Sequence, residues 1–154
     1  MKDLFTSLFR KFTESQVANI EKSNQHDVLI ATCALFLEMA YIDGEFTEAE
    51  RDKIVSILKN QYELPEDYIQ ELLTTSQRER EGSIDLWKFT NQINQNFSIE
   101  EKIRIIELIW KIVYTDGKLE KYEDYLIHKI SRLLNLKHSE LISAKLRVIE
   151  SGNA

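Results

Sequence analysis

The segment Ala40-Tyr-Ile-Asp-Gly-Glu-Phe-Thr-Glu-Ala-Glu-Arg51 returns later in the chain as Val113-Tyr-Thr-Asp-Gly-Lys-Leu-Glu-Lys-Tyr-Glu-Asp124. Tyr, Asp, Gly and a downstream Glu occupy the same places in both copies. Asp-Gly is a turn signal, and apolar residues at helical spacing flank each copy. The segment therefore predicts two helix-turn-helix units. Their acidic turns are either two copies of a good helix-to-helix joint or two halves of a cation site.

The repeat extends beyond the two turns. At an offset of 73 residues, apolar positions match in the pairs Ile30 and Ile103, Leu35 and Leu108, Met39 and Ile112, Phe46 and Leu119, Ile54 and Ile127, and Ile57 and Ile130. Each half reads as a buried helix, an Asp-Gly turn and an amphipathic helix. Because each such hairpin must cover an apolar face, we expect the two hairpins to pack on one another.

The composition of the 154-residue chain favours long helices with short joints. Hydrophobic residues make up 43% and charged residues 30%, with only 4 Gly and 1 Pro. A chain of this length buries enough surface to form a core without a disulfide or a structural metal. We expect an all-α fold, a single compact domain of seven or eight helices.

Apolar spacing, caps and breakers together predict where the helices lie. Two helices that are apolar on most sides are expected at the centre of the domain, at 26–42 and 99–114. Ser98 and Glu101 form a capping box before the second of these. Further helices are expected at 47–62, 64–80, 83–96, 119–133 and 138–150.

Residues 1–25 are expected to form an amphipathic N-terminal helix and a linker, with a joint at 23–25, ahead of a helical domain at 26–154. The N-terminal helix carries large apolar residues on one face, namely Leu4, Phe5, Leu8, Phe9 and Phe12. This face is expected to dock on the protein's own body, on a membrane surface or in a partner's groove. Phe5, Phe9 and Phe12 are the candidate partner-binding residues.

Charge and targeting signals narrow the class of protein. The net charge is −6, and Lys and Arg form no stripe, so nucleic acid is not an expected partner. The single Cys33 lies in an apolar stretch and is expected to fill the core in a reducing compartment. No signal-peptide pattern or membrane-spanning run is present, so we expect a cytoplasmic protein. The oligomeric state and the identity of a protein partner stay open.

The simplest interpretation of the acidic turns is structural. Gly44 and Gly117 can end a helix in the left-handed conformation, and the preceding aspartates can accept backbone N–H groups. Thr47 and Glu50 form a capping box for the helix that follows the first turn.

A cation site is the alternative, because Asp43 and Asp116 lie at the negative C-terminal pole of a helix, where a carboxylate is unfavourable. Both turns also match the second half of an EF-hand loop, with Asp at position 5, Gly at 6 and Glu at 12. Positions 1 and 3 carry no carboxylate, so neither turn is a regular calcium loop. A weaker site for a divalent cation is expected instead, for Ca²⁺ or Mg²⁺ rather than Zn²⁺. Its candidate ligands are Asp43, Glu45, Glu50, Asp116, Glu120 and Glu123.

Local charge favours the first turn as the stronger site. Residues 38–51 carry five acids and one base, a local charge of −4, whereas residues 111–124 carry four acids and three lysines. Carboxylates held close together need water, protonation or a cation to coexist.

The sequence carries no recognisable catalytic motif. His26, His128 and His138 are scattered, and there is no phosphate-binding glycine loop and no nucleophile motif. We expect His128 to be a surface or partly buried histidine and the protein not to be an enzyme.

Around these residues the chain resembles the TerB-like family, named for a tellurite-resistance protein, and the N-terminal part of the DjlA co-chaperones. The resemblance rests on residues 40–45 with Glu50, on 114–136, and on 138–145, and it covers about 26–147. It is closest to the stand-alone branch of the family. Lys118 departs from the pattern, since family members often carry Glu there.

The resemblance implies a helical metal-binding or stress-response domain with Asp43, Glu50, Asp116 and Glu123 as ligands. We therefore expect a non-enzymatic module that binds a divalent cation and presents a surface to a partner. The alternative is a metal-independent protein-protein interaction scaffold, a co-chaperone-like adaptor that contacts membranes through its N-terminal helix. No His-Pro-Asp tripeptide is present, so J-domain chemistry is not expected.

Overall fold

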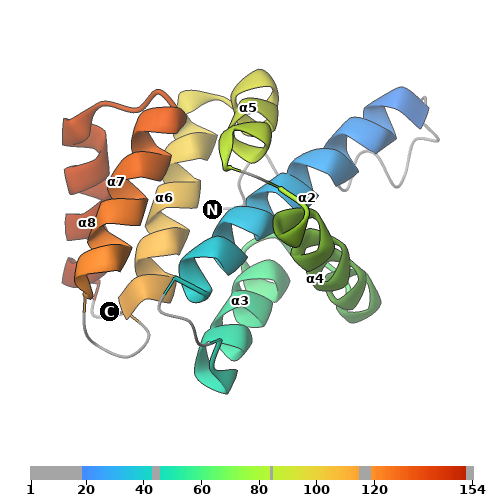
Figure 1. Cartoon of the computed structure of the whole chain (residues 1–154), viewed down its shortest axis with the longest axis horizontal. Helices are drawn as coiled ribbons and strands as arrows, with labels where there is room; N and C mark the ends of the chain where they lie inside the picture. Colours follow the sequence, from blue (N-terminus) through green and yellow to red (C-terminus); the bar gives the residue numbers. More distant parts are fainter. Residues whose placement is uncertain (1–18, 43–45, 84, 115–118, 152–154) are drawn as a thin grey trace.

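The computed structural model describes residues 19–42, 46–83, 85–114 and 119–151 (Figure 1). For residues 19–25 it describes the backbone only. Within these ranges the chain is all-α, as predicted, with seven helices and no strand. They are α2 (Asn19–Ala40), α3 (Glu48–Asn60), α4 (Glu66–Glu81), α5 (Trp87–Asn96), α6 (Ile99–Val113), α7 (Lys121–Leu133) and α8 (His138–Glu150). None of these helices combines the length and apolar character that a membrane span needs.

Helix α2 is the central element of the fold. It crosses the molecule in Figure 1, with α6, α7 and α8 side by side on one flank and α4 on the other. It packs against α4, α5 and α6. Its apolar residues are buried on nearly all sides, from Val28 to Ala40, which confirms the prediction of a buried central helix.

The predicted joint at 23–25 is wrong, because α2 begins at Asn19 and runs through it without interruption. The segment from 19 to 40 contains neither Gly nor Pro, so its polar start could extend the helix toward the N-terminus. The expected boundary between residues 25 and 26 therefore falls inside a helix. The N-terminal segment 1–18, including Phe5, Phe9 and Phe12, lies outside the described residues.

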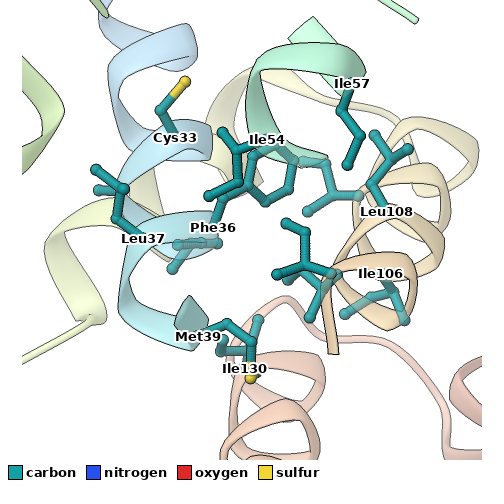
Figure 2. Close-up of a cluster of buried hydrophobic side chains, with 14 of the residues drawn as sticks. Cys33, Phe36, Leu37, Met39, Ile54, Ile57, Ile106, Leu108 and Ile130 are labelled. Atoms are coloured by element: carbon teal, nitrogen blue, oxygen red, sulfur yellow. The ribbon is translucent and has the colours of Figure 1, made fainter. Parts of the chain in front are cut away.

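The hydrophobic core joins helices from both halves of the sequence. Figure 2 shows Phe36 and Met39 of α2 near Ile54 of α3, Ile106 of α6 and Ile130 of α7, all of them buried. Each fully buried side chain of this size stabilises the fold by about 1.5–3 kcal/mol. Cys33 is also fully buried and free, which confirms its predicted role as core filler.

Helix starts agree with the local capping signals. Thr47 and Glu50 form the predicted capping box at α3, and Ser98 and Glu101 form the predicted one at α6. Helix α5 is shorter than expected, because it begins at Trp87 rather than at 83. The Oδ1 of Asp85 accepts the N–H of Trp87, and Ser83 instead closes the end of α4 through the carbonyl of Glu79.

The helix bounds keep the offset seen in the sequence. Helix α7 begins and ends 73 residues after α3, and α6 ends 73 residues after α2. Helices α2 and α3 both pack against α6. The Asp-Gly turns themselves, at 43–45 and 115–118, fall in the gaps of the described chain, so the repeated turn stays a prediction.

Candidate metal site at the acidic turns

Three of the six predicted ligands are described by the structure. Glu50 lies in the first turn of α3, Glu120 immediately precedes α7, and Glu123 lies in the first turn of α7. The other three, Asp43, Glu45 and Asp116, lie outside the described residues, as do Gly44, Gly117 and Lys118.

Glu50 is held by a reciprocal hydrogen-bond pair. Its Oε1 accepts the backbone N–H of Thr47 at 2.9 Å and the hydroxyl of Thr47 at 3.2 Å. In return the backbone N–H of Glu50 donates to Thr47 Oγ1 at 3.1 Å. These bonds satisfy donors that a helix start leaves open and fix the carboxylate near the end of the first turn.

Glu123 occupies the corresponding place in the second turn. Its Oε1 accepts the backbone N–H of Glu120 at 2.9 Å, the same distance as in the first copy. The two carboxylates therefore share one local geometry, set by the position three residues into the helix. Both also lie at the positive end of their helix, where a carboxylate is favourable.

Burial distinguishes the two copies. The side chain of Glu123 is only 4% exposed, whereas Glu120 and the Thr47–Glu50 pair are on the surface. A buried carboxylate is costly unless hydrogen bonds or cations compensate it. Local charge favours the first turn as the stronger site, but burial favours the second.

A cation from another helix lies beside the residues that precede the first turn. The guanidinium of Arg80, on α4, pairs with Glu38 at 3.0 Å and lies 4.4 Å from the centre of the Tyr41 ring. Tyr41 in turn packs on Phe46, with 4.8 Å between ring centres. The residues before and after the first turn are thereby tied together. Arg80 therefore compensates Glu38, one of the five acidic residues between positions 38 and 51. Because the two residues are 42 positions apart, a charge count over neighbouring residues does not include this pair.

Negative charge near the second turn acts on Tyr114. Partial burial, together with the carboxylate of Asp124, raises the pKa of the Tyr114 phenol above its usual range. Burial and the nearby Asp124 carboxylate both favour the neutral phenol.

The described ranges contain no group of three or more His, Cys, Asp or Glu side chains placed to hold a metal. Glu50, Glu120 and Glu123 therefore do not form one cluster. A complete ligand set at either turn would need the aspartates of the Asp-Gly pairs, backbone carbonyls and water.

Comparisons with known proteins give a family but no individual relative. No curated protein and no solved structure matches the chain. A family model described as tellurite resistance protein TerB matches residues 29–146. This match spans both acidic turns and most of the seven helices. The chain therefore belongs to the TerB family of tellurite resistance proteins.

Proposed function

We propose that this tellurite-resistance-related domain is a non-enzymatic, cytoplasmic stress-response module that binds a divalent cation at its acidic turns. Asp43, Glu50, Asp116 and Glu123 are the proposed ligands, with Glu45 and Glu120 adding negative charge nearby. The observation that carries the proposal is the matched setting of Glu50 and Glu123. Each carboxylate is held by a backbone N–H at 2.9 Å at the end of its turn.

The capping hydrogen bonds are compatible with cation binding. A carboxylate offers about four lone-pair sites, so one oxygen can accept an amide N–H while the group also coordinates a metal. Carboxylate, carbonyl and water oxygens are the ligands that Ca²⁺ and Mg²⁺ prefer, whereas Zn²⁺ favours nitrogen and sulfur. A bound cation would neutralise the turns and stiffen the surface around them for a partner.

The test is calorimetry of the chelator-treated chain with Ca²⁺, Mg²⁺, Mn²⁺ and Zn²⁺. We expect saturable binding of Ca²⁺ or Mg²⁺ that is at least fivefold weaker in Asp43→Asn/Glu50→Gln and in Asp116→Asn/Glu123→Gln. Glutamine can still accept the capping N–H, so the exchange of Glu for Gln removes charge while keeping the cap.

Helix α8 provides a matched control. The Oε1 of Glu140 accepts the N–H of Lys137 at 2.7 Å, so Glu140 has the same capping position without an Asp-Gly turn before it. Glu140→Gln should leave cation affinity unchanged. The absence of heat and of any thermal shift with Ca²⁺, Mg²⁺ and Mn²⁺ would refute the proposal, as would an equal loss of affinity in the control.

A metal-independent interaction scaffold is the second candidate. Helix α7 presents Tyr122 and Tyr125 three residues apart, 69% and 62% exposed, immediately after the second turn. Exposed aromatic side chains are enriched at protein interfaces. In this candidate the N-terminal apolar face, with Phe5, Phe9 and Phe12, adds a second contact to a protein or to a membrane surface.

Deletion of residues 1–12 tests the N-terminal part of this candidate. The deletion should abolish a pull-down partner or vesicle binding while leaving the helical circular dichroism of the domain intact. A truncated chain that keeps every interaction of the full chain would rule out that role.

A further inference from the structure

Two histidines that are ten residues apart in sequence meet between α7 and α8. The rings of His128 and His138 lie with their centres 5.7 Å apart and their planes inclined by 31°. His128 is on α7 with a side chain 30% exposed, as predicted for a partly buried histidine. His138 is the first residue of α8 and is exposed.

The surroundings of His128 determine which ring nitrogen carries the proton. Its Nδ1 lies 2.8 Å from the carbonyl oxygen of Asp124, one helical turn earlier. A carbonyl oxygen can only accept a hydrogen bond, so Nδ1 must donate and carry the hydrogen. In the neutral ring the lone pair is therefore on Nε2. A backbone carbonyl on Nδ1 is a common way in which proteins orient a metal-binding histidine.

Within the part of the chain that the structure describes, the His138 side chain makes no hydrogen bond, and its ring lies against that of His128. We propose that His128 and His138 form a bis-imidazole site for a borderline transition-metal cation such as Ni²⁺, Cu²⁺ or Zn²⁺, with water completing the coordination. Imidazole nitrogen suits these ions better than Ca²⁺ or Mg²⁺.

The spacing of the rings is compatible with one shared ion. The centre of an imidazole ring lies about 1.1 Å from its nitrogens, and a metal lies about 2.0–2.1 Å beyond a ligating nitrogen. Two rings on one ion therefore have centres at most about 6.4 Å apart. The observed 5.7 Å lies inside that limit.

The carboxylate of Asp124 adds negative charge close to His128. Its Oδ1 lies 3.6 Å from Nδ1 of His128, the nitrogen that does not bind the metal in this proposal. Negative charge there offsets the charge of a bound cation. The described residues supply no third His, Cys, Asp or Glu ligand here, so water would complete the coordination.

The test uses Ni²⁺, which does not oxidise thiols, on the chelator-treated full chain. Calorimetry should show Ni²⁺ binding that weakens at least fivefold in His128→Gln and in His138→Gln. In the NMR spectrum, Ni²⁺ below one equivalent should broaden the ring signals of His128 and His138 before those of His26. His26 is the matched control, because its Nδ1 is paired with the Tyr68 hydroxyl at 2.6 Å, away from this pair.

The outcomes also separate this site from the acidic turns. His26→Gln and the Asp43→Asn/Glu50→Gln variant should keep the Ni²⁺ affinity of the wild-type chain. A loss smaller than fivefold in His138→Gln, or an equal loss in His26→Gln, would overturn the proposal. Because His138 is exposed at a helix start, His138→Gln carries the test even if His128→Gln fails to fold.

Discussion

At the scale of single residues, Lys102 shows how a buried charge is accommodated. Its side chain is 7% exposed, although it lies in a helix start rich in charged residues. The Nζ donates to the carbonyl of Leu134 at 2.9 Å and to Asn94 Oδ1 at 3.1 Å. Asn94 in turn donates to the carbonyl of Leu133 at 2.9 Å. Lys102 and Asn94 thus satisfy carbonyls at the C-terminal end of α7.

Replacing Lys102 with methionine should therefore destabilise the fold. Methionine keeps much of the apolar stem but removes both hydrogen bonds, so the carbonyl of Leu134 and Oδ1 of Asn94 lose a partner, which costs about 1–3 kcal/mol. Urea unfolding monitored by circular dichroism measures this loss. Lys121→Met, at an exposed position on α7, should change the free energy of unfolding much less. Equal stability of the two variants would contradict the role given to Lys102.

Cys33 should be chemically silent in the folded chain. Complete burial raises the pKa of its thiol to about 12 from 9.0, and a hydrogen bond with Ser76 opposes this only in part. The thiol should therefore react with a disulfide reagent at pH 8 only after unfolding in urea.

The same shift predicts a pH dependence of stability. As the pH rises above 9, the Cys33 thiol ionises in the unfolded chain before it ionises in the folded chain. The free energy of unfolding should therefore fall between pH 9 and about pH 12. Below pH 9 this group should not affect the free energy of unfolding. The stability advantage of the wild-type chain over Cys33→Ala should shrink across this window. A constant difference would show that the thiolate is tolerated in the core.

At the scale of the elements, the helix starts are secured by reciprocal caps. Thr47→Ala removes the hydroxyl that accepts the Glu50 N–H and should cost about 1 kcal/mol. Hydrogen exchange at the Glu50 amide should accelerate by a corresponding factor. Ser98→Ala should have a similar effect at the Glu101 amide. Thr74→Ala, at an exposed position within α4, should not destabilise, and a loss there as large as in Thr47→Ala would mean that capping is not the cause.

At the scale of the whole molecule, one hydrophobic core joins the two sequence halves. Ile54 is fully buried in the cluster that joins α2, α3, α6 and α7. Ile54→Ala should cost about 2–5 kcal/mol, because it leaves a cavity that the neighbours fill only in part. The neighbouring Val55→Ala, which is only partly buried, should cost less.

Unfolding of Ile54→Ala should remain a single transition. Circular dichroism reports all the helices, whereas tryptophan fluorescence reports mainly Trp110, which is fully buried in α6. The two signals should change at the same urea concentration, since a shared core couples both halves. Separate midpoints would show that the halves fold independently.

The sequence predicted most of the secondary-structure elements, and its metal ligands stay a prediction. Both capping boxes, the buried central helix and the burial of Cys33 were predictable because they depend on residues within a few positions of one another. The error at 23–25 comes from treating polar residues as a break where no Gly or Pro interrupts the helix. The error at the start of α5 comes from missing the turn in which Asp85 accepts the N–H of Trp87. The pairing of Arg80 with Glu38 spans 42 residues and leaves no local signal.

By itself the sequence determined an all-helical fold, the places of the seven described helices, two of their capping boxes and the family to which the chain belongs, because apolar periodicity and capping act over one or two helical turns. Only the tertiary structure decided which charges are buried and which are compensated. Glu123, Lys102 and the His128–His138 pair owe their settings to how separate helices pack, and so does the Arg80 contact with the residues before the first turn. The strength of an electrostatic interaction depends on distance and burial in space, and neither is written in the order of residues along the chain.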